Sequence, residues 1–392
     1  MVKSSSPADN PSRLYLLDIL RGLLAFAVMV YHFYLGNGLA SHLGNWVPGF
    51  VDGLIAHCQV GLELFFVLSG FVIALTLPRE PVNARSAAAF ILRRQIRLDP
   101  PYWAALGLML ALGLLSSLLV PSHRHLVFPS LKDLLLNMFY LQGIAGQDPL
   151  LMVAWTLCLE VQFYLLFILL LWVGTLLKLN RPMQVLLSLP LFVWCICVFY
   201  GWLPTPQAYP TIFPALLVPF WAMFYTGVLA CWAWEDRRLQ PIFWGHLLLF
   251  TVPGLLAYRV DVLLRLLACT AVMVAALRGW LPWGARCRPL LVLAALSYSL
   301  YLVHVPIGGR VINLLLRVSH SPLACVLWLV LAVVASLAVA WILHHLVEVP
   351  SAQLGRRLKK RVVDAAPPPQ PPAPPPPAPA LPARKPAVLA RR

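Results

Sequence analysis

The chain has 392 residues, of which 60% are hydrophobic and only 11% are charged. A soluble domain carries about 25% charged residues, so a water-soluble fold of this composition would lack a polar surface. The 30 Lys and Arg residues outnumber the 14 Asp and Glu residues, which gives a net charge of +16. In so apolar a chain this excess is typical of cytoplasmic loops. We therefore expect a polytopic membrane protein and no nucleic-acid partner.

Ten apolar segments are long enough to be considered transmembrane helices, for which roughly 20 residues are needed. The predicted fold class is therefore all-α, with about ten transmembrane helices in a multi-pass arrangement. The segments lie at about 14–35, 59–77, 102–120, 150–173, 184–200, 213–233, 241–257, 262–278, 289–307 and 322–346.

The basic residues predict an orientation. When the connections between these segments are counted alternately, 23 Lys and Arg residues lie on the side of the N-terminus and 6 on the other side. The positive-inside rule then predicts that both termini are cytoplasmic. On this prediction the basic segment 78–101 is a cytoplasmic connection between two helices.

The predicted domain organisation has three parts. Residues 1–13 are expected to be a cytoplasmic N-terminus, and residues 14–350 a transmembrane domain. Residues 367–392 contain 12 of the 36 prolines together with four basic residues. Such a segment cannot bury a core, so 351–392 is expected to be a disordered, basic, Pro-rich cytoplasmic tail near membrane lipid.

No metal site is expected. The eight cysteines lie mostly within apolar runs and form no CxxC pair, which is typical of small buried residues. His344 and His345 are adjacent, so their side chains diverge by about 100° on a helix. The two imidazoles are therefore poorly placed to share one ion.

Ionisable side chains inside a membrane usually face the bundle interior or a water-filled cavity. The first segment contains Asp18, Arg21 and His32. Arg21 and His32 are 11 positions apart, which places them about 20° apart in angle and about 16 Å apart along a helix. Asp18 lies one turn before Arg21 and can pair with it. Alternatively, Arg21 reaches the lipid headgroups and His32 bonds a neighbouring carbonyl.

Two further clusters suggest a site. Glu160 lies amid aromatic residues in the fourth segment, where a carboxylate needs a cationic or hydrogen-bonding partner such as His32 or an arginine. Arg94 and Arg97 are one helical turn apart, and two guanidinium groups so spaced can converge on a phosphate. The alternative is that these arginines only anchor the chain at the membrane surface.

Several motifs occur in a fixed order. They are Leu17-Asp18 to Arg21-Gly22 with His32, Phe65-Phe66 to Ser69-Gly70-Phe71, Arg94 to Arg97 with Tyr102-Trp103, Trp155-Thr156 to Glu160 and Tyr164, Ser297-Tyr298 to Tyr301 and His304-Val305-Pro306, and Glu348-Val349-Pro350. In these motifs the chain resembles the acyltransferase type 3 family of membrane O-acyltransferases over roughly residues 14–350. Position 161 is Val where the family often has a second acidic residue.

The resemblance implies an O-acyltransferase of the bacterial inner membrane. Acyl-CoA, most commonly acetyl-CoA, is then the cytoplasmic donor, with Arg94 and Arg97 near its phosphates and Arg21 along its path. The acceptor is a hydroxyl of a carbohydrate or lipid-linked sugar on the outer side, and no cofactor is permanently bound. Residues expected to bind substrate or support the site are Asp18, Trp155, Tyr164, Tyr301, His304 and Glu348.

The chemistry of such a transfer requires a base for the acceptor hydroxyl, and histidine is the side chain best suited near neutral pH. We expect His32 to be that base and Glu160, or another buried carboxylate, to orient its ring. Two other classes remain open from the residues alone. One is a transporter of a polar solute or proton that uses the buried charges as a relay. The other is a membrane scaffold that acts through the Pro-rich tail.

Overall fold

A computed structural model describes residues 14–58, 61–77, 81–119, 128–203, 216–256 and 260–364. Across these ranges the regular secondary structure is entirely helical, without a strand, which confirms the predicted all-α class. The helices are α1 (Tyr15–Tyr31), α2 (Leu39–Leu43), α3 (Gly49–His57), α4 (Gly61–Thr76), α5 (Ala84–Leu119), α6 (Leu131–Met138), α7 (Ala154–Leu176), α8 (Arg181–Phe199), α9 (Trp221–Glu235), α10 (Gln240–Leu256), α11 (Val260–Leu277), α12 (Arg288–His304), α13 (Arg310–Leu315), α14 (Pro322–Leu343) and α15 (Val349–Asp364).

Each of the ten predicted segments coincides with a helix. In the described part of the chain, seven helical stretches are long and apolar enough to cross a membrane, and they contain α1, α4, α5, α7, α8, α12 and α14. The other three predicted segments correspond to α9, α10 and α11. The protein is thus a multi-pass membrane protein, while the number of ten spans and the cytoplasmic termini stay predictions.

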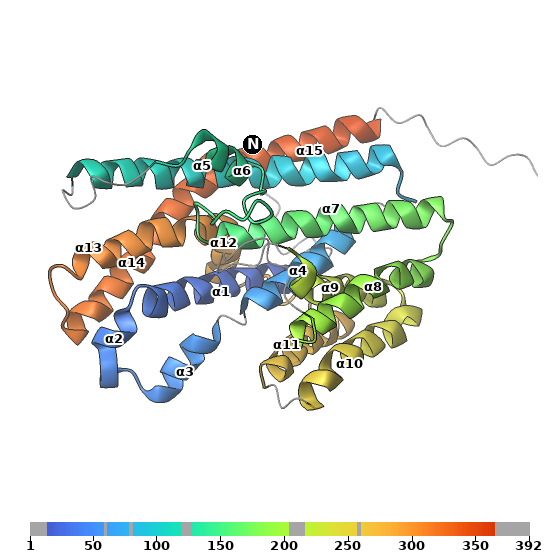
Figure 1. The fold of residues 1–392 in the computed structure, drawn as a ribbon, viewed down its shortest axis with the longest axis horizontal. Coiled ribbons are helices and arrows are strands. Elements are labelled where there is room, and N and C mark those ends of the chain that lie inside the picture. The colour runs from blue at the N-terminus through green and yellow to red at the C-terminus, as the bar shows by residue number, and fades with distance from the viewer. Residues whose placement is uncertain are drawn as a thin grey trace, which may run out of the picture.

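The helices pack around α1 and α4, which lie near the middle of the molecule (Figure 1). Helix α1 packs on α12, and α4 packs on α9. Glycines permit both approaches: a Cβ on Gly22 would lie 2.7 Å from the backbone nitrogen of Ala294 in α12. Gly70 of α4 likewise lies against the carbonyl of Phe224 in α9. Small residues are the usual means of bringing helix backbones together in membranes.

The segment 78–101 differs from the prediction of a connection between helices. From Ala84 onward it belongs to α5, which runs through Pro100 and Pro101 to Leu119. The two prolines remove backbone donors but membrane helices tolerate them where neighbouring groups compensate. At 1.5 Å per residue the 36-residue helix is about 54 Å long, well beyond the roughly 30 Å hydrocarbon core.

The predicted disordered tail is wrong for residues 351–364, because the chain there is helical as α15. Pro350 is the second residue of α15, in the first helical turn, where the missing N–H costs little. Helix α15 lies alongside α5 at one edge of the molecule (Figure 1), so packing stabilises a segment whose composition favours solvent. The predicted N-terminus, 1–13, and the Pro-rich segment, 367–392, lie outside the described residues.

Three π-helical turns interrupt the regular helices. They span His32–Gly36 after α1, Val305–Gly309 after α12 and His344–Glu348 after α14. The first and second of these turns contact each other. Each turn begins at or directly after a histidine, and single π turns within helices are often found at functional sites.

Candidate active site

A cavity of about 630 Å³ opens between α1, α5, α12 and the junction of α14 with α15. Its volume lies within the range that holds small-molecule ligands. Five arginines and two carboxylates are among its lining side chains. These are Arg21, Arg93, Arg94, Arg97 and Arg356, and Asp18 and Glu348. The formal charge of the lining is therefore +3 with His344 neutral, which suits a polyanionic ligand.

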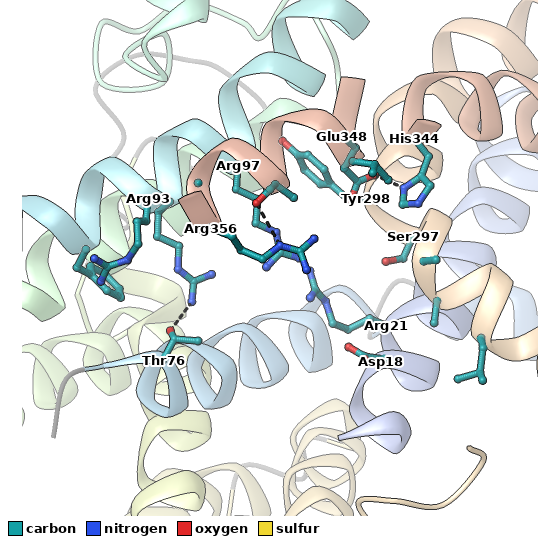
Figure 2. A pocket seen from close by; sticks show the side chains of 18 residues that line it. Asp18, Arg21, Thr76, Arg93, Arg97, Ser297, Tyr298, His344, Glu348 and Arg356 are labelled. Atoms are coloured by element: carbon teal, nitrogen blue, oxygen red, sulfur yellow. Dashed lines mark hydrogen bonds and ion pairs between the residues drawn. The ribbon is translucent and has the colours of Figure 1, made fainter. Parts of the chain in front are cut away.

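The arginines reach this cavity, which we call the basic pocket, from three helices. Figure 2 shows the side chains of Arg21, Arg97 and Arg356 pointing into it from α1, α5 and α15. Arg94 donates to the Thr76 hydroxyl of α4 at 3.0 Å. Arg94 and Arg97 are one turn apart on α5, as the spacing predicts, and both line the pocket.

A second, narrow space of about 40 Å³ adjoins the basic pocket. The two share four lining residues: Arg21, Arg94, Arg97 and Tyr298. Beyond them the narrow space is lined by Glu160 and Thr156 of α7 and Tyr301 of α12. We call it the inner channel, because it continues from the charged pocket into the middle of the helices.

The inner channel leads toward two histidines. The ring of Tyr301 lies 5.9 Å from that of His304, centroid to centroid. His304 is fully buried, and its Nε2 lies 2.9 Å from Nδ1 of His32. The Tyr301 hydroxyl is held by Thr156 at 2.7 Å. The histidine pair therefore lies directly behind Tyr301, a wall residue of the inner channel, and neither histidine lines either cavity.

The contacts of His304 assign the tautomers of both histidines. Nδ1 of His304 lies 3.1 Å from the carbonyl oxygen of Leu300, and a carbonyl only accepts, so this nitrogen carries the proton. Nε2 of neutral His304 is then an acceptor, and His32 must donate to it from Nδ1. As a result, Nε2 of His32 has a free lone pair, which is the form a general base requires.

The expected pairing of Glu160 with His32 is not formed. The partner of His32 is His304, whereas Glu160 accepts a hydrogen bond from Ser69 at 3.3 Å. Glu160 instead lies within electrostatic reach of Arg21 and Arg94. From the sequence, either a histidine or an arginine could be the partner of this carboxylate. The fold places Glu160 near the arginines because α7 packs on α4 and α5.

Glu348 lies in the third π turn and lines the basic pocket. Its Oε2 accepts from Ser299 at 2.7 Å and lies 2.9 Å from Nδ1 of His344 (Figure 2). A proline such as Pro350 usually marks the end of a helix. Here the chain nevertheless continues from the π turn directly into α15. Asp18 lines the same pocket, close in sequence to Arg21.

Trp155 and Tyr164 are not among the residues that line these cavities. The ring of Trp155 lies 6.0 Å from that of Phe220. Tyr164 is fully buried, donates to Gln95 and packs edge-on against Phe90. Tyr164 thus links α7 to α5, while Trp155 packs on Phe220, and the support role of both residues stays a prediction.

Sequence reasoning missed two members of the basic pocket, Arg93 and Arg356. Arg93 was not selected as a site residue, because the positive-inside rule already explains a basic residue in the segment 78–101. Arg356 was assigned to the tail, whose composition predicts no packed helix. All eight cysteines are free thiols, five of them buried. Within the described ranges, no three His, Cys, Asp or Glu side chains are grouped to hold a metal ion.

Comparisons with known proteins define the class. A family model described as an acyltransferase domain matches residues 14–345, which is most of the chain. The protein is thus a membrane acyltransferase, and it belongs to the acyltransferase type 3 family. This confirms the resemblance carried by the motifs and favours an enzyme over a transporter or a scaffold.

Three relatives illustrate the similarity. The chain is 28% identical over 341 residues to BcsY of Komagataeibacter xylinus, named as a membrane-bound transacylase, with 81% of this chain and 79% of that protein covered. It is 27% identical to nodulation protein 10 of Rhizobium leguminosarum bv. viciae, covering 89% and 96%. The exopolysaccharide production protein ExoZ of Rhizobium meliloti is 33% identical, over 27% of this chain and 32% of that protein. No solved structure matches the chain significantly.

Proposed function

We propose that this protein moves an acyl group from acyl-CoA on the cytoplasmic side to a hydroxyl of a carbohydrate or glycolipid on the outer side of a bacterial inner membrane. Acetyl is the first acyl group to test. The observation that supports this most directly is that the basic pocket adjoins the inner channel, whose wall residue Tyr301 packs on the histidine pair. No permanently bound cofactor is needed.

The donor side of the proposal rests on charge. CoA carries a diphosphate and a phosphomonoester, and guanidinium groups bind phosphate oxygens two at a time. Arg94 and Arg97 line both the basic pocket and the inner channel, so they can hold the phosphates at the mouth of the channel. Arg21 lines both spaces as well and borders the path of the pantetheine arm. Glu160 offsets part of the positive charge at that point and so reduces the mutual repulsion of the arginines.

The distance to the reacting centre also fits. His32 follows Arg21 by 11 residues on α1, which is about 16 Å along the helix. An extended pantetheine arm spans a comparable length, close to half of a roughly 30 Å hydrocarbon core. With the phosphates at Arg94 and Arg97 and the arm passing Arg21, the thioester arrives near Tyr301 and the histidine pair. The positive-inside count supports a cytoplasmic position for this pocket, with His32 toward the outer side.

The proposed chemistry is direct transfer. Nε2 of His32 removes the proton of the acceptor hydroxyl while its oxygen attacks the thioester carbonyl. The C–S bond then breaks, the acyl group stays on the acceptor oxygen, and the imidazolium returns the proton to the CoA sulfur. His304 keeps His32 in the required tautomer and shares the positive charge through their hydrogen bond. Cys158 is buried against Gln142, away from both cavities, so a cysteine acyl-enzyme is not favoured.

The acceptor class follows from the relatives. ExoZ is named for exopolysaccharide production, and BcsY for membrane-bound transacylation. A carbohydrate or lipid-linked sugar outside the membrane is accordingly the acceptor we propose for this chain. Such an acceptor meets His32 at the end of α1 that lies opposite the basic pocket.

Purified protein in detergent and radiolabelled acetyl-CoA test this function. Wild type should release CoA and label an added glycan or membrane extract. His32→Ala should lose activity by about 10²–10⁴-fold, the usual contribution of a positioned base, while binding of CoA persists. His57→Ala is the matched control, because His57 is exposed and bonds only the carbonyl of Gly53 in its own helix.

Two results would contradict the proposal. If His32→Ala transfers label as fast as wild type, His32 is not the base. If wild type neither binds nor consumes acyl-CoA of any chain length, acyl-CoA is not the donor.

A further inference from the structure

Helix α15 lies beyond the part of the chain that the family model matches, which ends at residue 345. It continues the path of α14 after the third π turn and packs on α5. The contact is close at Gly355, where a Cβ would lie 3.8 Å from Ile96 and 3.9 Å from the carbonyl oxygen of Arg93. Helix α15 is therefore held beside the arginine-bearing part of α5.

One face of α15 forms a wall of the basic pocket. The lining residues from this helix are Val349, Ala352, Gly355 and Arg356. Their spacing of three or four positions places them on a single side of a helix. Arg357 follows at about 100° around the helix and is not among the lining residues. Adjacent arginines of α15 thus have different surroundings, one in the pocket and one outside it.

The charge of the pocket depends on this helix. Without α15, four arginines and two carboxylates would line the cavity, and Arg356 is the fifth guanidinium. Figure 2 shows its side chain pointing toward Arg21 and Arg97 in the middle of the pocket. Its Nε donates to the Ala352 carbonyl of its own helix at 3.4 Å, which leaves its terminal NH₂ groups available. Guanidinium groups gathered in this way repel one another unless an anion lies between them.

From this arrangement we infer that Arg356 is a donor-binding residue: α15 places its guanidinium on the phosphates of the CoA moiety, opposite Arg21 and Arg97. The inference rests on the proposed acyl-CoA donor and adds to it an element outside the matched family segment. Helix α15 completes the phosphate site, and α5 fixes its position through the contact at Gly355. The thioester end of the donor does not contact Arg356.

The test compares Arg356→Gln with Arg357→Gln in the full-length protein. Inhibition constants of CoA and of pantetheine, which lacks all phosphates, are measured against acetyl-CoA at low ionic strength. A charge-assisted hydrogen bond contributes about 1.5–3 kcal/mol, so Arg356→Gln should weaken CoA by about 10-fold or more. Pantetheine should inhibit both variants as it does wild type, and Arg357→Gln should change neither constant more than about 2-fold.

Arg356→Lys separates charge from geometry. A lysine keeps the charge but loses the planar fork, so its affinity for CoA should fall between those of wild type and Arg356→Gln. Unchanged affinity of Arg356→Gln for CoA would overturn the inference. Equal weakening of CoA and pantetheine would overturn it too, since that pattern indicates distortion of the pocket. Failure of the wild-type protein to bind CoA would refute the proposed donor and this inference together. This outcome is distinguishable from the others because it is observed with the wild-type protein alone.

Discussion

At the scale of single residues, the hydrogen bond between His32 and His304 organises the candidate centre. A carboxylate partner for His32 was the sequence-based expectation, by analogy with catalytic triads. The structure supplies a second imidazole, held in turn by the carbonyl of Leu300. A neutral partner stabilises the imidazolium less than a carboxylate would. It also avoids placing an uncompensated negative charge inside a membrane protein.

This arrangement predicts different effects for two substitutions of His304. His304→Ala removes the acceptor for Nδ1 of His32, and the ring can then adopt the unproductive tautomer. We expect acetyl transfer to fall by about 10²-fold, within the range attributed to a positioned base. His304→Gln offers a side-chain oxygen near the position of Nε2, so it should recover a substantial part of that loss.

The measurement is kcat and KM for acetyl-CoA in both variants. The effect should appear in kcat, because His304 lines neither the basic pocket nor the inner channel. Equal activity of the alanine and glutamine variants would contradict the tautomer argument, and a change confined to KM would place His304 in donor binding instead.

At the scale of helices, close packing through glycine fixes the distance between elements that bear the site. Gly70 of α4 lies against the carbonyl of Phe224 in α9, and Gly227 of α9 lies against the carbonyl of Val67 in α4. The contact is reciprocal, because each helix places a glycine against a backbone carbonyl of the other. Separating the two helices would therefore open both contacts. Ser69, next to Gly70, donates to Glu160, and the packing of α4 on α9 thereby sets the wall of the inner channel.

Gly70→Ala should therefore destabilise the protein, since the added methyl group overlaps a backbone carbonyl that cannot rotate away. Overpacking of this kind costs about 1–3 kcal/mol. Gly113→Ala in α5 is the control, because a Cβ there meets nothing within 4 Å. Thermal unfolding in detergent, followed by size-exclusion chromatography, should show a lower midpoint for Gly70→Ala only. Equal midpoints for the two variants would show that α4 and α9 lie further apart than the contact between Gly70 and the Phe224 carbonyl requires.

At the scale of the whole molecule, the functional groups are divided between two regions of the fold. The basic pocket involves α1, α5, α12 and the α14–α15 junction, whereas the histidine pair lies where the first two π turns meet. Helices α8 to α11 gather on another side of the bundle (Figure 1). None of their described side chains lines the basic pocket or the inner channel. The proposed transfer thus needs only part of the bundle.

The Pro-rich segment 367–392 is also dispensable on this view. Among the residues that the structure describes, those that line the basic pocket and the inner channel precede position 357. A variant that lacks 367–392 should keep wild-type acetyl transfer within about 2-fold, as its composition predicts no packing role. Activity per mole of purified protein is the measurement. A variant with normal yield but no activity would restore the scaffold hypothesis, in which the tail is the functional element.

The sequence by itself determined the fold class, the family and most residues of the site. Apolar segments of membrane length, buried ionisable residues and six ordered motifs are local features, and local features can be read along a chain. Arg94 and Arg97 could be predicted to converge because one helical turn separates them.

Only the tertiary structure decided which distant residues meet. The partner of His32 lies 272 positions away on α12, and no periodicity can choose between that histidine and Glu160. Residues 351–364 have a composition that suits solvent, yet they are helical because α5 offers a surface on which α15 packs. Arg356 lines the basic pocket because the same packing of α15 on α5 brings it there. Packing between helices depends on the whole fold, so these contacts could not be predicted from any one segment.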